Sequence, residues 1–126
     1  MLVSAAMSPY TKSQSGGDVF EPVCRSSDIE DNSSQAFTVN QRDVLIVRTG
    51  QDFYALENRC SHQAAPLHGG RIRRGMIACP LHGVMFELKT GKPHGRLTQL
   101  CVETFELEVR DEVIYVAIPE EDTWGV

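Results

Sequence analysis

Cys60-Ser61-His62 and Cys79-Pro80-Leu81-His82, with sixteen residues between them, are the most informative stretches of this chain of 126 residues. Two thiolates and two imidazoles in two short segments can hold one zinc ion. They can also hold a two-iron two-sulfur cluster, with cysteine on one iron and histidine on the other. Zinc is redox-inert and would make the site structural, whereas the cluster takes up and releases one electron at a time.

The spacing of the four residues bears on the choice of metal. Zinc fingers usually take two cysteines from one segment and two histidines from another. Here each segment contributes one cysteine and one histidine. Such mixed segments suit a binuclear centre in which each loop gives its cysteine to one iron and its histidine to the other. The spacing therefore favours the cluster and leaves zinc as the alternative.

The residues around these four positions follow a wider pattern. It consists of Cys60-Ser61-His62-Gln63-Ala64-Ala65-Pro66-Leu67 with Gly69-Gly70, of Cys79-Pro80-Leu81-His82-Gly83, and of Phe86 and Thr90-Gly91. This pattern resembles the two cluster-binding loops of the Rieske iron-sulfur family, and the resemblance covers about residues 18 to 118. It implies one [2Fe-2S] cluster bound by Cys60, His62, Cys79 and His82, in a Rieske domain with a cluster-binding subdomain at about 58–96.

The resemblance also implies a function. It is to Rieske ferredoxins that pass single electrons from a flavin-dependent reductase to the terminal oxygenase of an aromatic-ring-hydroxylating dioxygenase system. The chain would then be a monomeric electron carrier and not an enzyme. Two alternatives remain open: a Rieske-type small subunit of a cytoplasmic NADH-dependent nitrite reductase and, if the metal is zinc, a zinc-stabilised interaction module.

The length of the chain limits its organisation. A chain of 126 residues has room for one domain with a modest core. Rieske-type oxygenases need a further, larger domain that holds a mononuclear iron, and we expect no such domain here. We predict a flexible tail at residues 1–17, rich in Ser and Gly, and a single domain at 18–126.

The sequence indicates the cellular compartment, and the compartment determines what we expect of the cysteines outside the ligand motif. No apolar run approaches the ~20 residues that a membrane helix needs, and the first seven residues lack the basic region of a secretory signal. We therefore expect a soluble, cytoplasmic protein without membrane contact. Cys24 and Cys101 lie outside the ligand motif, and in a reducing compartment we expect both to be buried free thiols.

Charge is unevenly distributed along the chain. Between Arg59 and Arg96 there are seven basic residues and one acidic residue, Glu87, a net charge of +6. Because the whole chain carries −5, the remainder carries −11. This separation suggests that a basic, cluster-bearing end is steered toward an acidic patch on a redox partner; the alternative is a solvated surface that serves solubility. The overall acidity argues against binding of nucleic acid.

Short apolar runs between turn residues indicate an all-β protein, either an antiparallel sandwich or a small barrel, with the cluster-binding loops as an insertion. In the segment 104–109 the alternation places Phe105, Leu107 and Val109 on one face. We expect hairpin turns at 40–43 and 110–112, and one helical turn at 26–31 capped by Ser26 or Ser27. The expected strands are 19–23, 35–39, 44–47, 53–56, 76–78, 85–88, 104–109 and 113–118.

Two departures from the family pattern concern the cluster environment. High-potential members carry an extra cysteine in each loop, joined as a disulfide, and a Ser and a Tyr whose hydroxyl groups bond to sulfur. The corresponding places here are Ala65 or its neighbour, Leu81, Val84 and Phe86, which implies a potential at the low end of the range, about −150 mV. The family's Gly-Pro covering segment is replaced by Lys92-Pro93-His94-Gly95-Arg96-Leu97.

Arg96, His68 and His94 lie near the motif, and we interpret them as ordinary surface residues and not as parts of the metal site. We expect a covering loop of altered shape in which Arg96 is solvated. His68 and His94 have no Cys or His at a spacing that would complete a second metal site. We therefore expect both to be exposed or hydrogen-bonded histidines.

Overall fold

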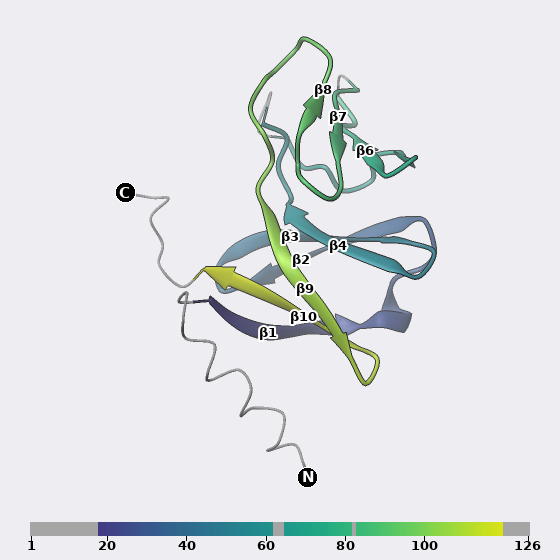
Figure 1. Cartoon of the computed structure of the whole chain (residues 1–126), viewed down its shortest axis with the longest axis vertical. Helices are drawn as coiled ribbons and strands as arrows, with labels where there is room; N and C mark the ends of the chain where they lie inside the picture. Colours follow the sequence, from purple (N-terminus) through teal and green to yellow (C-terminus); the bar gives the residue numbers. More distant parts are fainter. Residues whose placement is uncertain (1–17, 62–64, 82, 120–126) are drawn as a thin grey trace.

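The computed structural model describes residues 18–61, 65–81 and 83–119, which form two antiparallel sheets (Figure 1). The larger sheet consists of β1 (Asp18–Arg25), β2 (Ser33–Val39), β3 (Arg42–Thr49), β4 (Asp52–Glu57), β9 (Thr104–Arg110) and β10 (Val113–Pro119). Their spatial order is β1-β10-β9-β4-β3-β2. The smaller sheet consists, in spatial order, of β5 (Ile72–Arg73), β6 (Met76–Ala78), β7 (Met85–Glu87) and β8 (Pro93–His94).

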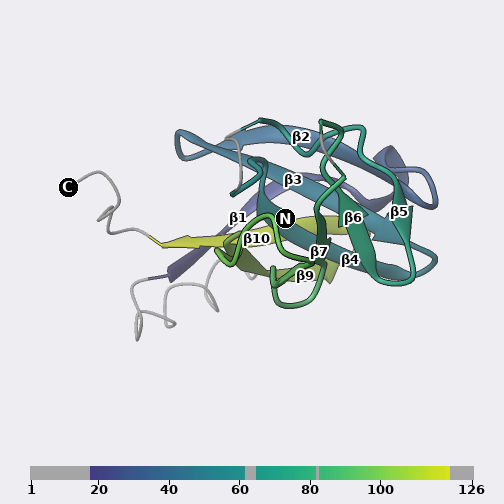
Figure 2. The same cartoon turned by 90° about the horizontal axis from the view of Figure 1, so that it is seen from above.

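The smaller sheet is an insertion between β4 and β9, and it stands at one end of the larger sheet (Figures 1 and 2). The all-β class and the inserted subdomain predicted from the sequence are therefore confirmed. All eight expected strands are present; β5 and β8, of two residues each, were not predicted. The predicted tail at 1–17 lies outside the described residues and stays a prediction. In the described part of the chain, no helix has the length and apolar character needed to cross a membrane.

Strand β3 is buried on both faces. Val44, Leu45, Ile46 and Val47 are all inaccessible to solvent. Because successive side chains of a strand point to opposite faces, Val44 and Ile46 enter one hydrophobic cluster while Leu45 and Val47 enter another. This explains why the strand has an uninterrupted apolar run in place of an alternating pattern.

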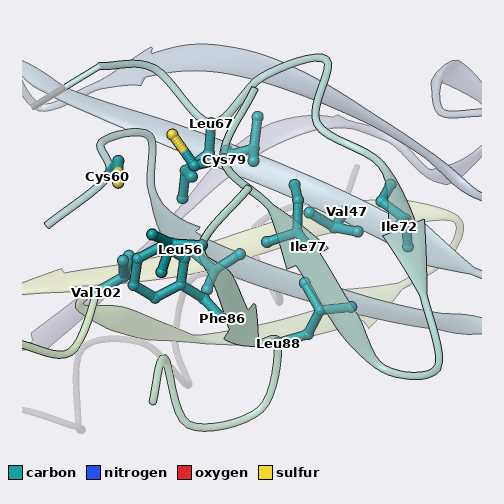
Figure 3. Packing of buried hydrophobic residues seen from close by; sticks show 12 residues of the cluster. Val47, Leu56, Cys60, Leu67, Ile72, Ile77, Cys79, Phe86, Leu88 and Val102 are labelled. Carbon is teal, nitrogen blue, oxygen red and sulfur yellow. The ribbon is translucent and has the colours of Figure 1, made fainter. Parts of the chain in front are cut away.

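The two clusters divide the core. The body cluster belongs to the larger sheet and consists of Ile29, Val39, Val44, Ile46, Ala55, Phe105, Ile114, Val116 and Ile118. The inter-sheet cluster joins the two sheets and consists of Leu45, Val47, Leu56, Cys60, Leu67, Ile72, Ile77, Cys79, Val84, Phe86, Leu88 and Val102. Figure 3 shows the inter-sheet cluster with Phe86 packed beside Leu56 and Val102. Both predicted cysteine ligands are therefore part of the core that fixes the smaller sheet on the larger one.

The side chains on the apolar face of β9 become more exposed from Phe105 to Val109. Phe105 is buried in the body cluster, and Leu107 packs against that cluster from a partly exposed position. Val109, which alternation places on the same face, is 43 % exposed. Near the final hairpin of β9 and β10, the apolar face thus extends beyond the core.

Both predicted hairpin turns are present. Asn40 and Gln41 join β2 to β3 with φ values of 51° and 67°, and Asp111 and Glu112 join β9 to β10 with the same two values. Positive φ at both central residues is the type I′ geometry that matches the twist of paired strands.

The predicted helical turn at 26–31 is shorter than expected. It is a 3-10 helix, η2 (Ser26–Asp28). The prediction that Ser26 or Ser27 caps it is wrong, because Arg25 occupies the cap position and donates its backbone N–H to Asp28 Oδ2 at 2.9 Å. The helix ends because Ile29 has an extended backbone and is fully buried in the body cluster.

Acid should weaken the smaller sheet through Glu87. The Thr90 hydroxyl donates to Glu87 Oε1 at 2.7 Å, and His94 Nε2 lies 2.8 Å from Oε2. The Thr90 bond, followed by the His94 bond, lowers the pKa of Glu87 from its ordinary value of 4.5. A lowered pKa in the folded state stabilises the fold above about pH 4.5, and this stabilisation is lost as the pH falls through the folded-state pKa.

The Thr90→Val substitution removes the larger cause of that shift. We expect the melting temperature of the variant to change less steeply with pH than that of the unmodified chain below about pH 4.5. Calorimetric melting across this range measures the slope. The control is Thr38→Val on the exposed side of β2. Equal slopes for all three proteins would contradict the role given to Thr90.

Candidate metal centre

Cys60 begins the first predicted ligand loop, shortly after β4 ends. Its side chain is fully buried in the inter-sheet cluster. Its backbone N–H donates to the carbonyl oxygen of Ala65 at 2.7 Å, which closes a turn. Leu67, also fully buried, returns the chain to the same cluster. The position of Cys60 is thus fixed by its own burial, by the hydrogen bond to Ala65 and by the return of the chain at Leu67.

Cys79 begins the second predicted ligand loop, directly after β6. It is 3 % exposed, and its backbone N–H donates to the carbonyl oxygen of Val84 at 2.8 Å. Gly83 donates back to the Cys79 carbonyl at 2.9 Å and has a φ of 79°, a conformation that favours glycine. Both cysteines therefore donate to the carbonyl five residues further along. Figure 3 shows the two cysteines at the same end of the inter-sheet cluster.

Of the four histidines, the structure describes His68 and His94. His62 and His82 lie outside the described residues, so their assignment as ligands stays a prediction. His68 is exposed, and His94 is hydrogen-bonded to Glu87, which agrees with the interpretation made from the sequence. Among the described residues, no three or more His, Cys, Asp or Glu side chains are grouped so that they could hold a metal ion.

Residues 95–101 overlap the end of the predicted covering loop and are called the covering segment from here on; Ser61 ties this segment to the first ligand loop. The Ser61 hydroxyl donates to the carbonyl oxygen of Leu100 at 2.6 Å and lies 3.5 Å from Thr98 Oγ1. The backbone N–H of Leu100 also donates to Thr98 Oγ1 at 3.1 Å. Because Ser61 stands between Cys60 and His62 in the sequence, this segment is anchored at the predicted metal centre. Arg96, in the same segment, is exposed as expected.

Three exposed apolar side chains belong to the second ligand loop and to the covering segment. Leu81 of the second ligand loop is 57 % exposed, and Leu97 and Leu100 of the covering segment are 55 % and 66 % exposed. Val109 is the other exposed large apolar residue in the part of the chain that the structure describes. Exposed apolar side chains that cluster near a site commonly mark a surface that another protein covers.

The prediction of two buried thiols outside the motif is wrong for Cys101 and only partly right for Cys24. Cys24 in β1 is partly buried, but Cys101 is exposed. Cys101 is the last residue of the covering segment, and the chain becomes buried at the next residue, Val102 of the inter-sheet cluster. None of the four cysteines forms a disulfide.

Cys101 should react with thiol reagents far faster than Cys24. Burial, with a smaller contribution from the Asp28 charge, raises the pKa of Cys24 from 9.0 to about 11. Because the thiolate is the nucleophile, this shift alone slows alkylation of Cys24 at pH 8 by roughly 100-fold. Mass spectrometry after brief iodoacetamide treatment of the cluster-loaded protein should find Cys101 modified before Cys24, and Cys24 should remain nearly unmodified in a Cys101→Ser variant. Equal labelling of the two residues would contradict the burial of Cys24.

The two described cysteines fit the sulfur donors of an iron-sulfur cluster. A thiolate buried among apolar side chains is costly unless a cation compensates its charge, and a bound metal supplies that compensation. Cys60 and Cys79 are both buried, and they come from two loops with the same hydrogen-bonding pattern. Two such loops can hold a metal group from two sides.

Sequence reasoning missed one residue of this region. Asn58, two positions before Cys60, is buried and bonds to the far side of the first loop. The sequence shows only that an amide side chain stands two residues before a predicted ligand. That signal alone does not distinguish a buried Asn from the many that lie on the surface.

Comparison with known proteins identifies the family. Residues 19–106 match the Rieske [2Fe-2S] domain. Ferredoxin CarAc of Metapseudomonas resinovorans is 33 % identical over 96 residues, which span 75 % of this chain and 90 % of that protein.

Two solved structures extend the comparison. The ferredoxin of carbazole 1,9a-dioxygenase from Nocardioides aromaticivorans IC177 has a TM-score of 0.74 at 31 % identity, over 77 % of this chain and 95 % of that one. A chain in the complex of reduced oxygenase and oxidized ferredoxin in carbazole 1,9a-dioxygenase has a TM-score of 0.72 at 31 % identity. This match covers 82 % of this chain and 95 % of that one.

These matches decide between the two metals that the spacing left open. The matched region of the family contains both cysteine loops and most of the two sheets. The cofactor is therefore one Rieske cluster and not a zinc ion. In its fold, its buried cysteine loops and its similarity along residues 19–106, this chain belongs to the Rieske [2Fe-2S] family.

Proposed function

We propose that this chain is a ferredoxin that passes single electrons from a flavin-dependent reductase to a terminal ring-hydroxylating oxygenase. One observation carries the proposal: two ferredoxin structures from carbazole 1,9a-dioxygenase match this chain over 95 % of their own length. The similarity thus extends from the cluster loops to the whole of those carriers. The chain would act as a monomeric carrier, without catalysis of its own, in the cytoplasm, where NADH supplies the reductase.

The proposed ligands are Cys60 and Cys79 on one iron and His62 and His82 on the other. When bound, the cluster supplies a site that stores and releases one electron. The inter-sheet cluster buries the two cysteines and so excludes water from the sulfur side of the centre. The neutral histidines would favour the ferrous state of their iron.

The surface around the loops suits a protein partner. Leu81 precedes His82 in the sequence, and Leu97 and Leu100 belong to the segment that Ser61 ties to the first ligand loop; all three offer exposed apolar contact. The seven basic residues of the segment 59–96 are all exposed: Arg59, Arg71, Arg73, Arg74, Lys89, Lys92 and Arg96. In the part of the chain that the structure describes, none of these seven side chains forms an ion pair. Exposed charges of one sign attract a partner of the opposite sign and speed association. The proposed partner surface is therefore acidic around an apolar centre.

Reconstitution tests the function. The purified chain is mixed with candidate reductase and oxygenase components, and NADH-dependent hydroxylated product is measured. We expect product only when the chain is present, and none with a Cys79→Ser variant, which lacks a proposed ligand. Absence of turnover, together with tight copurification with a sirohaem protein, would instead support the alternative of a nitrite reductase small subunit.

The midpoint potential should lie at the low end of the Rieske range, about −150 mV. Val84 and Phe86 are buried beside the second ligand loop and offer no hydroxyl group, and none of the four cysteines forms a disulfide. Hydrogen bonds to sulfur raise the potential because they stabilise the reduced, more negative cluster. Protein-film voltammetry measures the value, and a clearly positive midpoint would contradict this description of the surroundings.

A further inference from the structure

Asn58 stands apart from the rest of the core. Among the described residues it is the one buried polar or charged side chain, at 8 % exposure. Burial of an amide is unfavourable unless its polar atoms are hydrogen-bonded. The contacts of Asn58 therefore indicate why the chain retains a polar group at this position.

The carboxamide of Asn58 joins three segments. Its Oδ1 accepts the backbone N–H groups of Leu67 and His68, both at 2.9 Å. Its Nδ2 donates to Asp43 Oδ2 at 3.3 Å, and its backbone N–H donates to the Asp43 carbonyl at 2.9 Å. The side chain thus links the residues before Cys60 to the residues that follow the first ligand loop, and Asp43 of β3 anchors it.

We propose that Asn58 is a positioning residue of the metal centre, whose carboxamide closes the first ligand loop and so fixes Cys60. An amide is suited to this role because one oxygen can accept two N–H groups while the nitrogen donates to a carboxylate. Leucine of similar size would leave the two N–H groups without an acceptor. Aspartate would keep the acceptor but would place a second carboxylate against Asp43.

The first test compares Asn58→Leu with Asp43→Ala. Asp43→Ala removes the partner of Nδ2 but leaves the two bonds to the loop, so it is the matched control. We expect Asn58→Leu to lose its cluster roughly 10- to 100-fold faster, because removing a group that orients a metal ligand typically lowers metal affinity by that factor. The control should stay within about two-fold. The rate is followed as bleaching of the visible absorption in the presence of a chelator.

Spectroscopy separates positioning from general stability. If Asn58 positions Cys60, the Asn58→Leu protein that still holds a cluster should show altered g-values in the reduced state and an altered midpoint potential. A variant that was only less stable would melt earlier but would keep both properties. Unchanged g-values and midpoint potential in Asn58→Leu would overturn the proposal, whatever its bleaching rate.

An exchange variant keeps the proposal testable if Asn58→Leu does not fold. The double substitution Asn58→Asp with Asp43→Asn restores every bond with the roles reversed. The carboxylate introduced at position 58 would accept the two loop N–H groups, and the amide introduced at position 43 would donate to that carboxylate. We expect the double variant to retain the cluster within about two-fold of the unmodified chain and to show its g-values. If the folded exchange variant loses its cluster ten-fold faster, the bonds described here are not what holds the loop, and the proposal is wrong.

Discussion

The Gly70→Ala variant is expected to lose its cluster during purification, although Gly70 is not a ligand. A Cβ atom at this position would lie 1.9 Å from the carbonyl oxygen of Ala78 and 3.1 Å from that of Leu67. Both neighbours are backbone, which cannot rotate away as a side chain can. One methyl group would therefore push apart the end of the first ligand loop and the strand that leads to Cys79.

The size of this effect follows from overpacking. Forcing one methyl group into a closed site typically costs about 1–3 kcal/mol, and here the site lies between the two cysteine-bearing segments. We expect the melting temperature to fall by about 10 °C and the visible absorption of the cluster to be largely absent. Both are measured on protein that has been purified anaerobically.

The adjacent glycine provides the control. Gly69 has a φ of 88°, but a Cβ at that position would meet nothing within 4 Å. Gly69→Ala should therefore incur only the cost of the left-handed conformation, about 1–2 kcal/mol, and should keep its cluster. If Gly69→Ala lost the cluster and Gly70→Ala kept it, the close approach to Ala78 would not be the reason that glycine is needed.

These two glycines illustrate what the sequence could not decide. The pair Gly69-Gly70 was part of the pattern that predicted the ligand loop. The sequence does not show that the two glycines are required for different structural reasons. Gly69 provides a backbone conformation, and Gly70 provides space. Space depends on which segment packs against the loop, and that contact comes from β6, outside the loop itself.

The strands show the same division between local and tertiary information. The run from Val44 to Val47 predicted a strand because β-branched and apolar residues are typical of strands. The uninterrupted run fits burial on both faces, but the segments that cover each face could not be predicted, because one of them is the smaller sheet that folds back over β3. Strands β5 and β8 are two residues long, which is too short for any alternation to be recognised.

The candidate site was predictable where chemistry alone limits the choice. Few residue types bind iron or zinc, so the spacing of Cys60 and Cys79 with two histidines was sufficient to propose a ligand set. Asn58 and Cys101 were not predictable in this way. An Asn or a Cys is compatible with the surface and the interior, and only packing decides that the first is buried and the second exposed.

Gly91→Ala should be the most destabilising of the glycine substitutions, because this position combines two demands. Gly91 has a φ of 78°, and a Cβ there would lie 1.9 Å from the carbonyl oxygen of Val102. Its backbone N–H donates to the carbonyl oxygen of Glu87 at 2.8 Å, and its carbonyl accepts the N–H of Val102 at 2.9 Å. Gly91 thus joins the turn after β7 to the segment that enters β9, and so holds the smaller sheet on the larger one.

Gly75 offers a control with almost the same backbone. Its φ is 77°, but a Cβ at that position would meet nothing within 4 Å. Gly75→Ala should cost about 1–2 kcal/mol for the left-handed conformation and lower the melting temperature by about 5 °C. Gly91→Ala adds the overpacking cost and should lower it by about 15 °C. Because the two positions have nearly the same φ, the difference between the two melting temperatures measures the contact with Val102. Equal losses would show that the contact contributes nothing to the join between the sheets.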